Sequence, residues 1–212
     1  KITFFQTICQ RCNNRDIELF AEIHCARCNQ THLYCRNCVQ MERMMECDFL
    51  YLWTGPSYPW KKYDKSLTWN GKLTFAQERA AEKIIETISN NGELLIWAVT
   101  GAGKTEMLFP GIEVALRLGK RVCIATPRID VVRELTPRLK KAFKNVPIQS
   151  LYGGSNDKDG TAQLIISTTH QLLRFYQAFD VLIIDEIDAF PYHQDETLQF
   201  AAKRAVKKEA GL

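Results

Sequence analysis

A glycine-rich string that joins an apolar run to a helical pattern constrains the fold of this chain more than any other feature. The string is Ala98-Val99-Thr100-Gly101-Ala102-Gly103-Lys104-Thr105. Residues 94–99 are apolar and predict a strand, and the pattern that starts near Lys104 predicts a helix. Glycines between a strand and a helix let several backbone N–H groups point inward, where the positive helix N-terminus reinforces them. The string therefore predicts a loop that binds phosphate groups.

Each position of this loop has an expected task. Lys104 reaches the β- and γ-phosphates of ATP, and the hydroxyl of Thr105 binds Mg²⁺. The cradle itself consists of the backbone at Thr100, Gly101, Ala102 and Gly103. Ala98 stands where the phosphate-loop pattern begins with glycine, a departure that helicase-type loops accept. The alternative interpretation is a glycine-rich turn before an ordinary helix.

A second string supplies carboxylates at the end of a strand. It is Val181-Leu182-Ile183-Ile184-Asp185-Glu186-Ile187-Asp188. Four apolar residues before the acids predict a strand that is buried on both faces of a parallel sheet, and such sheets bind ligands at the carboxyl ends of their strands. We expect Asp185 to position Mg²⁺ through water, and Glu186 to orient and deprotonate the attacking water. Lys104, Asp185 and Glu186 are thus the predicted catalytic residues, and solvated acids at a strand end are the alternative.

Alternation of strands and helices around these strings predicts an α/β fold. We expect a RecA-like P-loop NTPase domain with a parallel sheet over residues 73–212, preceded by a cysteine-rich zinc module (1–48) and an aromatic and basic linker (49–72). The 212 residues, 46% of them hydrophobic, suffice for one such domain and a small module. No apolar run approaches the length that spans a bilayer. A net charge of +4 suggests a nucleic-acid partner without establishing one.

Three C-x-x-C pairs crowd the first 38 residues. They are Cys9/Cys12, Cys25/Cys28 and Cys35/Cys38. Several such pairs in one short segment favour Zn²⁺ held by four thiolates, and a segment with few apolar residues needs such a crosslink to fold. We predict zinc at the first and third pairs, with Cys25 and Cys28 in an inserted loop or replacing one of those pairs. Redox chemistry and disulfides are the alternatives.

The sequence supports weaker predictions for two histidines, two single cysteines and the linker. His24 and His32 are substitute ligands, although structural or exposed roles are expected more often for such histidines. Cys47 and Cys123 are predicted to be ordinary buried thiols. In the linker, closely spaced aromatic residues and lysines either stack on bases or cover the neighbouring domain, and we favour the second interpretation.

Beside the phosphate loop, the sequence suggests residues for adenine and nucleic acid. Thr74 is expected to cap a helix whose first turn contains Gln77, about twenty residues before the loop; helicases read adenine with a glutamine there, and a surface glutamine is the alternative. Two further loops follow predicted strands. Their hydroxyls and cations suit phosphodiester oxygens, and the residues concerned are Thr126, Pro127, Arg128, Thr168 and Thr169. Residues 196–212 predict a basic helix.

The motif order resembles the first RecA-like domain of superfamily 2 helicases over residues 73–190. The strings AVTGAGKTEM, TPRIDVVREL and IDEIDAFP, together with a cysteine module before the motor domain, resemble the ComFA family of late competence proteins. This resemblance implies a motor that uses ATP, Mg²⁺ and Zn²⁺ and helps to import single-stranded DNA. It also implies other competence proteins of the uptake channel as partners, in the cytoplasm and peripherally at the inner membrane face.

The same resemblance predicts what this chain does alone. A second RecA-like domain is expected to be absent from it, so that an isolated N-terminal fragment would hydrolyse ATP poorly. The runner-up motor is a replication-restart helicase of the PriA type, whose cysteines interrupt the second motor domain. An RNA helicase fits less well. The competitor from another class is a non-motor, zinc-stabilised nucleic-acid-binding module that uses ATP as a switch.

Overall fold

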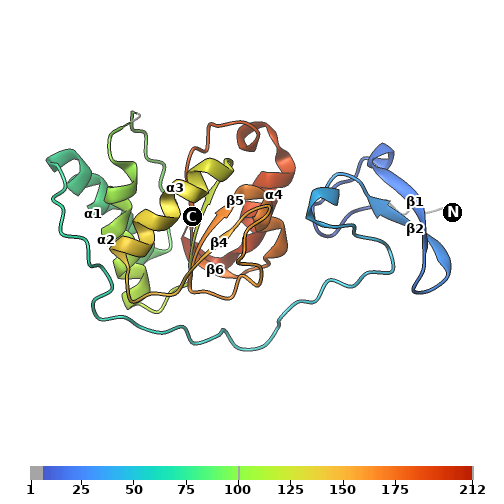
Figure 1. Ribbon diagram of the computed structural model, residues 1–212, viewed down its shortest axis with the longest axis horizontal. Coiled ribbons are helices and arrows are strands. Elements are labelled where there is room, and N and C mark those ends of the chain that lie inside the picture. Colours follow the sequence, from blue (N-terminus) through green and yellow to red (C-terminus); the bar gives the residue numbers. More distant parts are fainter. Residues whose placement is uncertain (1–6, 100, 212) are drawn as a thin grey trace.

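Two folded units and an extended connection make up the part of the chain that the computed structural model describes, residues 7–99 and 101–211 (Figure 1). The first unit is built around an antiparallel hairpin of β1 (Phe20–Cys25) and β2 (Gln30–Cys35). Short 3-10 helices flank the hairpin at Ile17–Leu19 and at Val39–Met41. The hairpin brings cysteines that are distant in sequence to its two ends.

The second unit contains a five-stranded parallel sheet with the order β4-β5-β3-β6-β7. Its strands are β3 (Val122–Thr126), β4 (Ile148–Leu151), β5 (Leu164–Thr168), β6 (Phe179–Ile184) and β7 (Val206–Gly211). Every residue of β3 and β5 is buried, as expected for central strands covered on both faces. The predicted α/β class, with a parallel sheet behind a cysteine module, is confirmed.

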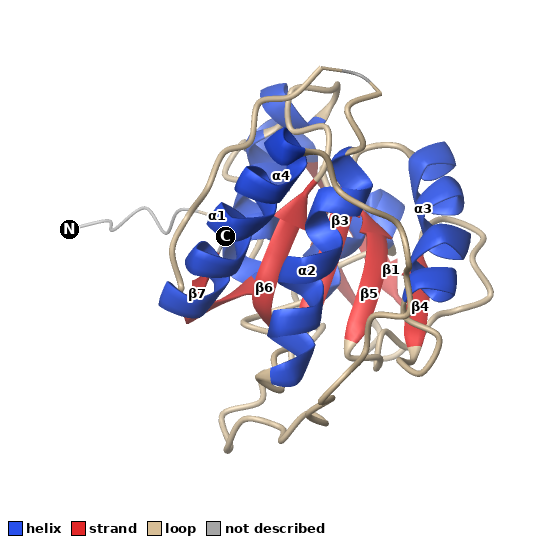
Figure 2. Cartoon of the chain, turned by 90° about the vertical axis from the view of Figure 1, so that its left-hand side faces the viewer, coloured by secondary structure: helices blue, strands red, loops and turns tan. Residues whose placement is uncertain are grey.

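Helices cover both faces of this sheet (Figure 2). They are α1 (Phe75–Asn90), α2 (Lys104–Arg117), α3 (Ile129–Ala142) and α4 (Glu196–Ala205), with 3-10 helices at Thr169–Arg174 and Tyr192–Gln194. Val122 and Ile124 of β3 pack with α1, α2 and α3, whereas the intervening Cys123 packs with α4 on the other face. This alternation is the period of a strand, and it gives the unit two hydrophobic layers.

The predicted start of α1 is confirmed in detail. The Thr74 side chain accepts a hydrogen bond from the Gln77 backbone N–H, and the Gln77 side chain accepts one from the Thr74 backbone N–H. This reciprocal pair is a capping box, which satisfies donors that the first turn of a helix leaves free. Asn91, at a φ of 53° in the left-handed region, ends the helix.

Two secondary-structure elements predicted from the sequence differ from those that the structure shows. Residues 94–99 form no strand in the described part of the chain, and Leu95, Trp97 and Val99 are exposed. The predicted strand there is therefore wrong, because an apolar run does not supply the neighbouring strand whose hydrogen bonds a strand requires.

The basic tail, predicted as a helix over residues 196–212, is helical only as far as Ala205. From Val206 the chain forms β7, which pairs in parallel with β6, and Lys207 forms an ion pair with Asp180 at 2.6 Å. The open backbone groups of β6 explain the change, because unpaired edge groups accept an added strand even where the local sequence favours a helix.

Packing of α3 gives a direct test of the core. Leu139 is fully buried in the cluster between this helix and the sheet, whereas its neighbour Lys140 is exposed. We expect Leu139→Ala to lower the free energy of unfolding by about 2–5 kcal/mol, because it removes buried methyl groups and leaves a cavity. Lys140→Ala should change it by less than about 0.5 kcal/mol. Denaturant melts of both variants measure the difference, and equal stabilities would contradict this packing.

Candidate nucleotide site and metal centre

The backbone before α2 has the curvature that a phosphate-binding loop requires. Gly101 and Gly103 lie at φ values of 80° and 70°, in the left-handed region that side-chain-bearing residues avoid. Gly103 is also the residue that precedes the first turn of α2. A Cβ at Gly103 would lie 2.3 Å from Nε2 of Gln77, so a side chain there would displace the glutamine. No side chain among the described residues caps the N-terminus of α2, so its first N–H groups are available to an anion.

Gln77 ties the first turn of α1 to this loop. Its Nε2 donates to the backbone oxygen of Ala102 at 2.8 Å, while its Oε1 serves the capping box. The side chain that we expect to read adenine is therefore already fixed beside the phosphate loop, and its contact with adenine stays a prediction. Thr105 is buried at the start of α2, and Lys104 is exposed next to it. Thr100 lies outside the described residues.

The carboxylate pair follows β6 at the carboxyl end of the sheet. The Asp185 backbone N–H donates to the oxygen of Ala125 at 2.8 Å, which continues the pairing of β6 with β3. The Glu186 backbone N–H donates to Oδ1 of Asp185 at 3.0 Å, and Glu186 itself has a φ of 56°. Figure 2 shows the arrowheads of β3, β5 and β6 and the loop before α2 at the same end of the sheet.

One atom of this pair fits an additional ligand. Oε2 of Glu186 is buried and has no hydrogen-bond partner among the described residues. A buried carboxylate oxygen without a partner is costly, so such an atom marks a place for a water or a cation. The donor set of Thr105, Asp185 and Glu186 consists of oxygens, which suits hydrated Mg²⁺. The residues present therefore fit a nucleotide with its magnesium ion.

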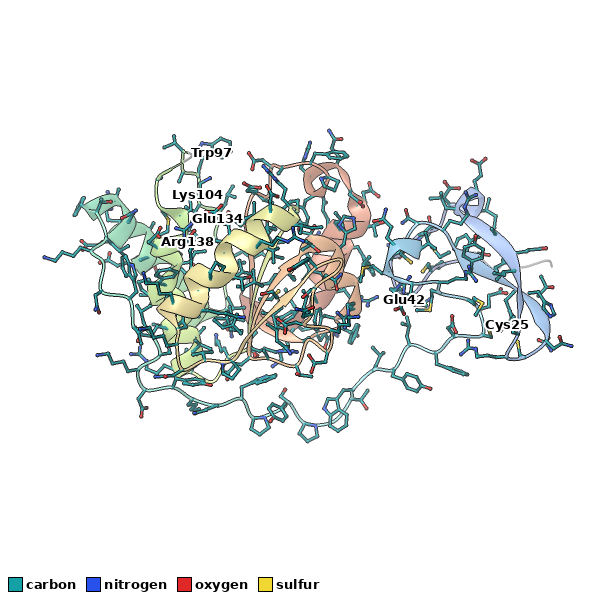
Figure 3. The ribbon with its side chains drawn as sticks, in the orientation of Figure 1. Cys25, Glu42, Trp97, Lys104, Glu134 and Arg138 are labelled. Atoms are coloured by element: carbon teal, nitrogen blue, oxygen red, sulfur yellow. The ribbon has the colours of Figure 1, made fainter. Side chains whose placement is uncertain are left out.

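Arg138 connects the nucleotide loop helix to α3. It donates to Glu106 on α2 at 2.6 Å and to Glu134 on its own helix at 3.2 Å. Figure 3 shows Arg138 and Glu134 on α3 beside the end of α2 that carries Lys104. The four-residue spacing to Glu134 could have indicated one of these contacts, but nothing local indicates the contact with Glu106.

The residues that we expect to contact nucleic acid lie at the same carboxyl end of the sheet, but they differ in how exposed they are. Thr126, Thr168 and Thr169 are buried, and Oγ1 of Thr126 and of Thr169 have no partner among the described residues. Pro127 is half-buried, whereas Arg128 is exposed and pairs with Asp130. The bond to Asp130 and then the charge of Glu186 raise the pKa of Arg128. Arg128 thus carries its positive charge near the acid pair.

Four cysteine sulfurs converge in the first unit. The Sγ atoms of Cys9, Cys12, Cys35 and Cys38 all lie within 4.8 Å of one another, and all four residues are buried. Cys9 and Cys38 are 3.8 Å apart, and Cys12 and Cys35 are 3.6 Å apart. Four sulfurs bound tetrahedrally to one zinc at about 2.3 Å would lie about 3.8 Å apart. The predicted ligand set is therefore assembled, and its geometry fits one Zn²⁺.

Hydrogen bonds favour a thiolate in this cluster. The neighbouring thiols of Cys12 and Cys38 lower the pKa of Cys9, and backbone N–H groups add to the effect against the cost of burial. Contacts with the thiols of Cys38 and Cys9, and burial, raise the pKa of Cys12. A bound metal would replace the thiol protons, because the thiolate is the metal ligand.

Two arginines that sequence reasoning missed hold this cluster in place. Arg11 is buried between the two halves of the site, where it donates to the Cys38 sulfur at 3.1 Å and to the Met41 oxygen at 2.7 Å. Arg204 of α4 donates to the backbone oxygens of Gln10 and Arg11, at 3.0 and 2.5 Å. Burial lowers the pKa of Arg204. The cysteine cluster is thereby joined to the sheet unit.

The remaining cysteines lie elsewhere. Cys25 and Cys28 are at the far end of the hairpin from Cys35, and Figure 3 shows Cys25 in the part of that unit farthest from α4. Cys123 is fully buried in β3, and burial raises the pKa of its thiol to about 12. Cys47 is only partly buried, with its sulfur 3.6 Å from that of Cys25. The prediction of an ordinary buried thiol at Cys47 is therefore wrong.

Comparison with known proteins identifies relatives of both units. Residues 3–52 match the family described as the competence protein ComFA N-terminal domain, and residues 70–208 match that described as type III restriction enzyme, res subunit. A competence protein ComFA of Bacillus subtilis (strain 168) is 55% identical over 96% of this chain and 43% of that protein. One of Streptococcus pneumoniae (strain ATCC BAA-255 / R6) is 42% identical over 90% of this chain and 45% of that protein.

A more distant similarity links the chain to another group. The replication restart protein PriA of Bacillus subtilis (strain 168) is 26% identical over 65% of this chain and 18% of that protein. The fold and the two nucleotide motifs define a RecA-like domain of the superfamily 2 helicase class. More narrowly, the chain belongs to the ComFA family of competence proteins and corresponds to their N-terminal portion. It spans less than half the length of the two ComFA relatives.

None of the helices in the described part of the chain combines the length and the apolar character that crossing a bilayer requires.

Proposed function

We propose that this chain is the nucleotide-binding part of an ATP-dependent motor that moves single-stranded DNA into the cell during natural transformation. The observation that carries the proposal is 55% identity, over nearly the whole chain, to a protein named for competence. The motor would work in the cytoplasm at the inner face of the membrane. Its expected partners are other competence proteins of the uptake channel.

The chemistry assigned to the site follows from the side chains. Lys104 would bind the β- and γ-phosphates of ATP, and the backbone around Gly101 and Gly103 would hold the remaining phosphate oxygens. Magnesium, held by Thr105 and Asp185, supplies positive charge to the phosphate oxygens when it is bound. Glu186 would orient the attacking water and take its proton. The unpartnered Oε2 of Glu186 supports this role, because it is available to accept that hydrogen bond.

A groove beside the cysteine unit supports a path for single-stranded DNA. Its lining contains exposed cationic side chains, Lys158, Arg174 and Lys203, and the linker rings of Tyr51 and Trp53. Four carboxylates also line it, those of Glu42, Glu46, Asp48 and Asp157. Tyr51 is 91% exposed and Trp53 is 79% exposed, so these two rings do not cover the neighbouring domain as we expected from the sequence, and both are free to stack on bases. Cations attract the phosphates of any sequence, as a translocating motor requires.

A second contact is proposed at the loops after β3 and β5. Arg128 is the exposed cation there, so it would bind a phosphodiester oxygen. The buried hydroxyls of Thr126, Thr168 and Thr169 would orient the loops, with Pro127 fixing the backbone next to Arg128. This position beside Glu186 would let DNA binding alter the acid that activates water.

ATP hydrolysis by a protein of the relatives' length that contains this chain tests the proposal. Rates are measured alone and with single-stranded DNA, duplex DNA or single-stranded RNA at one salt concentration. We expect single-stranded DNA to stimulate hydrolysis at least tenfold and the other two to have little effect. Equal stimulation by RNA would contradict the DNA role, and ligand-dependent binding without stimulated turnover would favour an ATP-controlled switch.

The similarity to PriA supports one alternative, a helicase for replication restart. A forked DNA substrate added to the same assay distinguishes the two. Stimulation by forks well above that by plain single strands would favour restart over uptake.

A further inference from the structure

Three cysteine sulfurs converge at the end of the hairpin opposite the Cys9/Cys12/Cys35/Cys38 cluster, and a histidine lies beside one of them. The sulfurs of Cys25, Cys28 and Cys47 all lie within 4.8 Å of one another. Nε2 of His32 lies 3.0 Å from the Cys28 sulfur. We propose that these four side chains bind a second Zn²⁺, distinct from the one assigned to the first cluster. Cys25 and Cys35 are five positions apart along the paired strands, which sets the two sites about 17 Å apart.

The turn at Cys25 repeats the turn at Cys9. The first reads Cys9-Gln-Arg-Cys12-Asn13 and the second reads Cys25-Ala-Arg-Cys28-Asn29. In both, the asparagine N–H donates to the oxygen of the first cysteine at 2.8 Å. Asn13 and Asn29 have nearly equal φ values, 61° and 57°. The turn at Cys9 belongs to a four-thiol cluster. Because the turn at Cys25 has the same backbone geometry, it presents its two sulfurs in an arrangement that can bind a metal ion.

The arginine of each turn performs the same task. Arg11 reaches the sulfur of Cys38, the ligand supplied from outside its own turn, at 3.1 Å. Arg27 reaches the sulfur of Cys47, also from outside its turn, at 3.9 Å, and forms an ion pair with Asp48. In each case a guanidinium lies beside the sulfur that comes from outside the turn, where it complements the negative charge of a metal-bound thiolate. The repeat therefore extends from the backbone to the residues around the ligands.

Cys47 reaches the turn because residues 44–48 run along β2. The Cys35 N–H donates to the Met44 oxygen at 3.1 Å, and the Glu46 N–H donates to the Leu33 oxygen at 3.0 Å. These contacts follow β2 from the Cys35 end toward the hairpin tip. Asp48 then closes a tight turn by accepting from the Met45 N–H at 2.7 Å. The side chain of Cys47, thirty-five positions after Cys12, is thereby placed at the other end of the hairpin.

His32 has the surroundings of a metal ligand. Its Nδ1 lies 3.7 Å from Oε2 of Glu46, which also accepts from the Leu33 N–H at 2.9 Å. Metal-bound histidines commonly donate their second ring nitrogen to a carboxylate, which fixes the ring. His24, by contrast, is engaged with Asn29 at 3.0 Å. Three sulfurs and one imidazole nitrogen are a ligand set that Zn²⁺ prefers.

Zinc content tests the second site. We expect the chain, purified without chelators, to contain two zinc ions when its metal content is measured by elemental mass spectrometry. We also expect Cys25, Cys28 and Cys47 to be protected from alkylation. Cys47→Ser should leave one zinc and expose Cys25 and Cys28. Cys123→Ala is the matched control, because it removes a thiol that lies in the sheet, and it should retain two. One zinc per chain with these three thiols freely alkylated would overturn the proposal, as would a disulfide between Cys25 and Cys47.

The fourth ligand has its own test. Co²⁺ is substituted for zinc, and its absorption bands report the number of thiolates and the tetrahedral geometry. We expect His32→Ala to weaken metal binding at this site by 10- to 100-fold and to shift the Co²⁺ bands, and His24→Ala to do neither. Unchanged affinity and spectrum in His32→Ala would overturn the histidine assignment. This result does not depend on whether the protein moves DNA.

Discussion

Replacing Lys104 by alanine is expected to abolish ATP turnover in a protein that contains this chain and to weaken ATP binding by about 10- to 100-fold. The ammonium group would bind the phosphates by charge-assisted hydrogen bonds, each worth about 1.5–3 kcal/mol. The side chain is exposed at the first turn of α2, so its removal leaves no cavity. Nucleotide titration of the chain and hydrolysis by the longer protein measure the two effects.

A second variant separates binding from chemistry. Glu186→Gln keeps the size of the side chain but cannot take a proton, so we expect affinity to stay within about threefold while turnover falls by about 10²- to 10⁴-fold. Lys140→Ala, on the exposed face of α3, is the control for charge alone and should leave both quantities unchanged. Normal turnover in Lys104→Ala would remove the loop from the mechanism. Normal turnover in Glu186→Gln would remove the proposed base.

The nucleotide motifs could be read from sequence because each is a local pattern with a local structural cause. Gly101 and Gly103 are glycines because the loop turns through left-handed backbone, and the apolar run before Asp185 is a buried strand. Non-local pairing could not be read in the same way. β7 exists because β6 offers it an open edge, while residues 94–99 remain unpaired despite a strand-like sequence. Both outcomes depend on which backbone groups meet in space.

The cysteines show the same limit. Spacing identified each C-x-x-C turn, but only the hairpin decides which turns share a metal. β1 and β2 carry Cys25 and Cys35 to opposite ends of one ladder, so the second and third pairs cannot belong to one cluster. Cys47 has no paired cysteine nearby in the sequence. Its part in a cluster follows from the run of residues 44–48 along β2, a contact that spacing does not encode.

Loss of the first cysteine cluster is expected to unfold the N-terminal unit. Cys12→Ser removes one of four buried sulfurs, and four-thiolate zinc sites in small modules supply about 10–16 kcal/mol of apparent binding free energy. The hairpin and its short 3-10 helices lack the apolar core to compensate. Because both proposed metal sites lie in this unit, we expect both zinc ions to be lost, with rapid proteolysis between residues 7 and 48. Gln10→Ala, at an exposed position of the same turn, should change neither.

The effect should also reach the sheet unit through Arg204. Its guanidinium donates to four backbone oxygens, two on the cysteine turn at Gln10 and Arg11 and two on the sheet unit at Leu173 and Phe175. When the cysteine unit unfolds, Arg204 loses two of these four hydrogen bonds, and water replaces the lost acceptors. We therefore expect the free energy of unfolding of the sheet unit in Cys12→Ser to fall by about 1–3 kcal/mol. Hydrogen exchange in α4 measures this loss. Unchanged exchange there, with zinc gone, would mean that the two units are energetically independent.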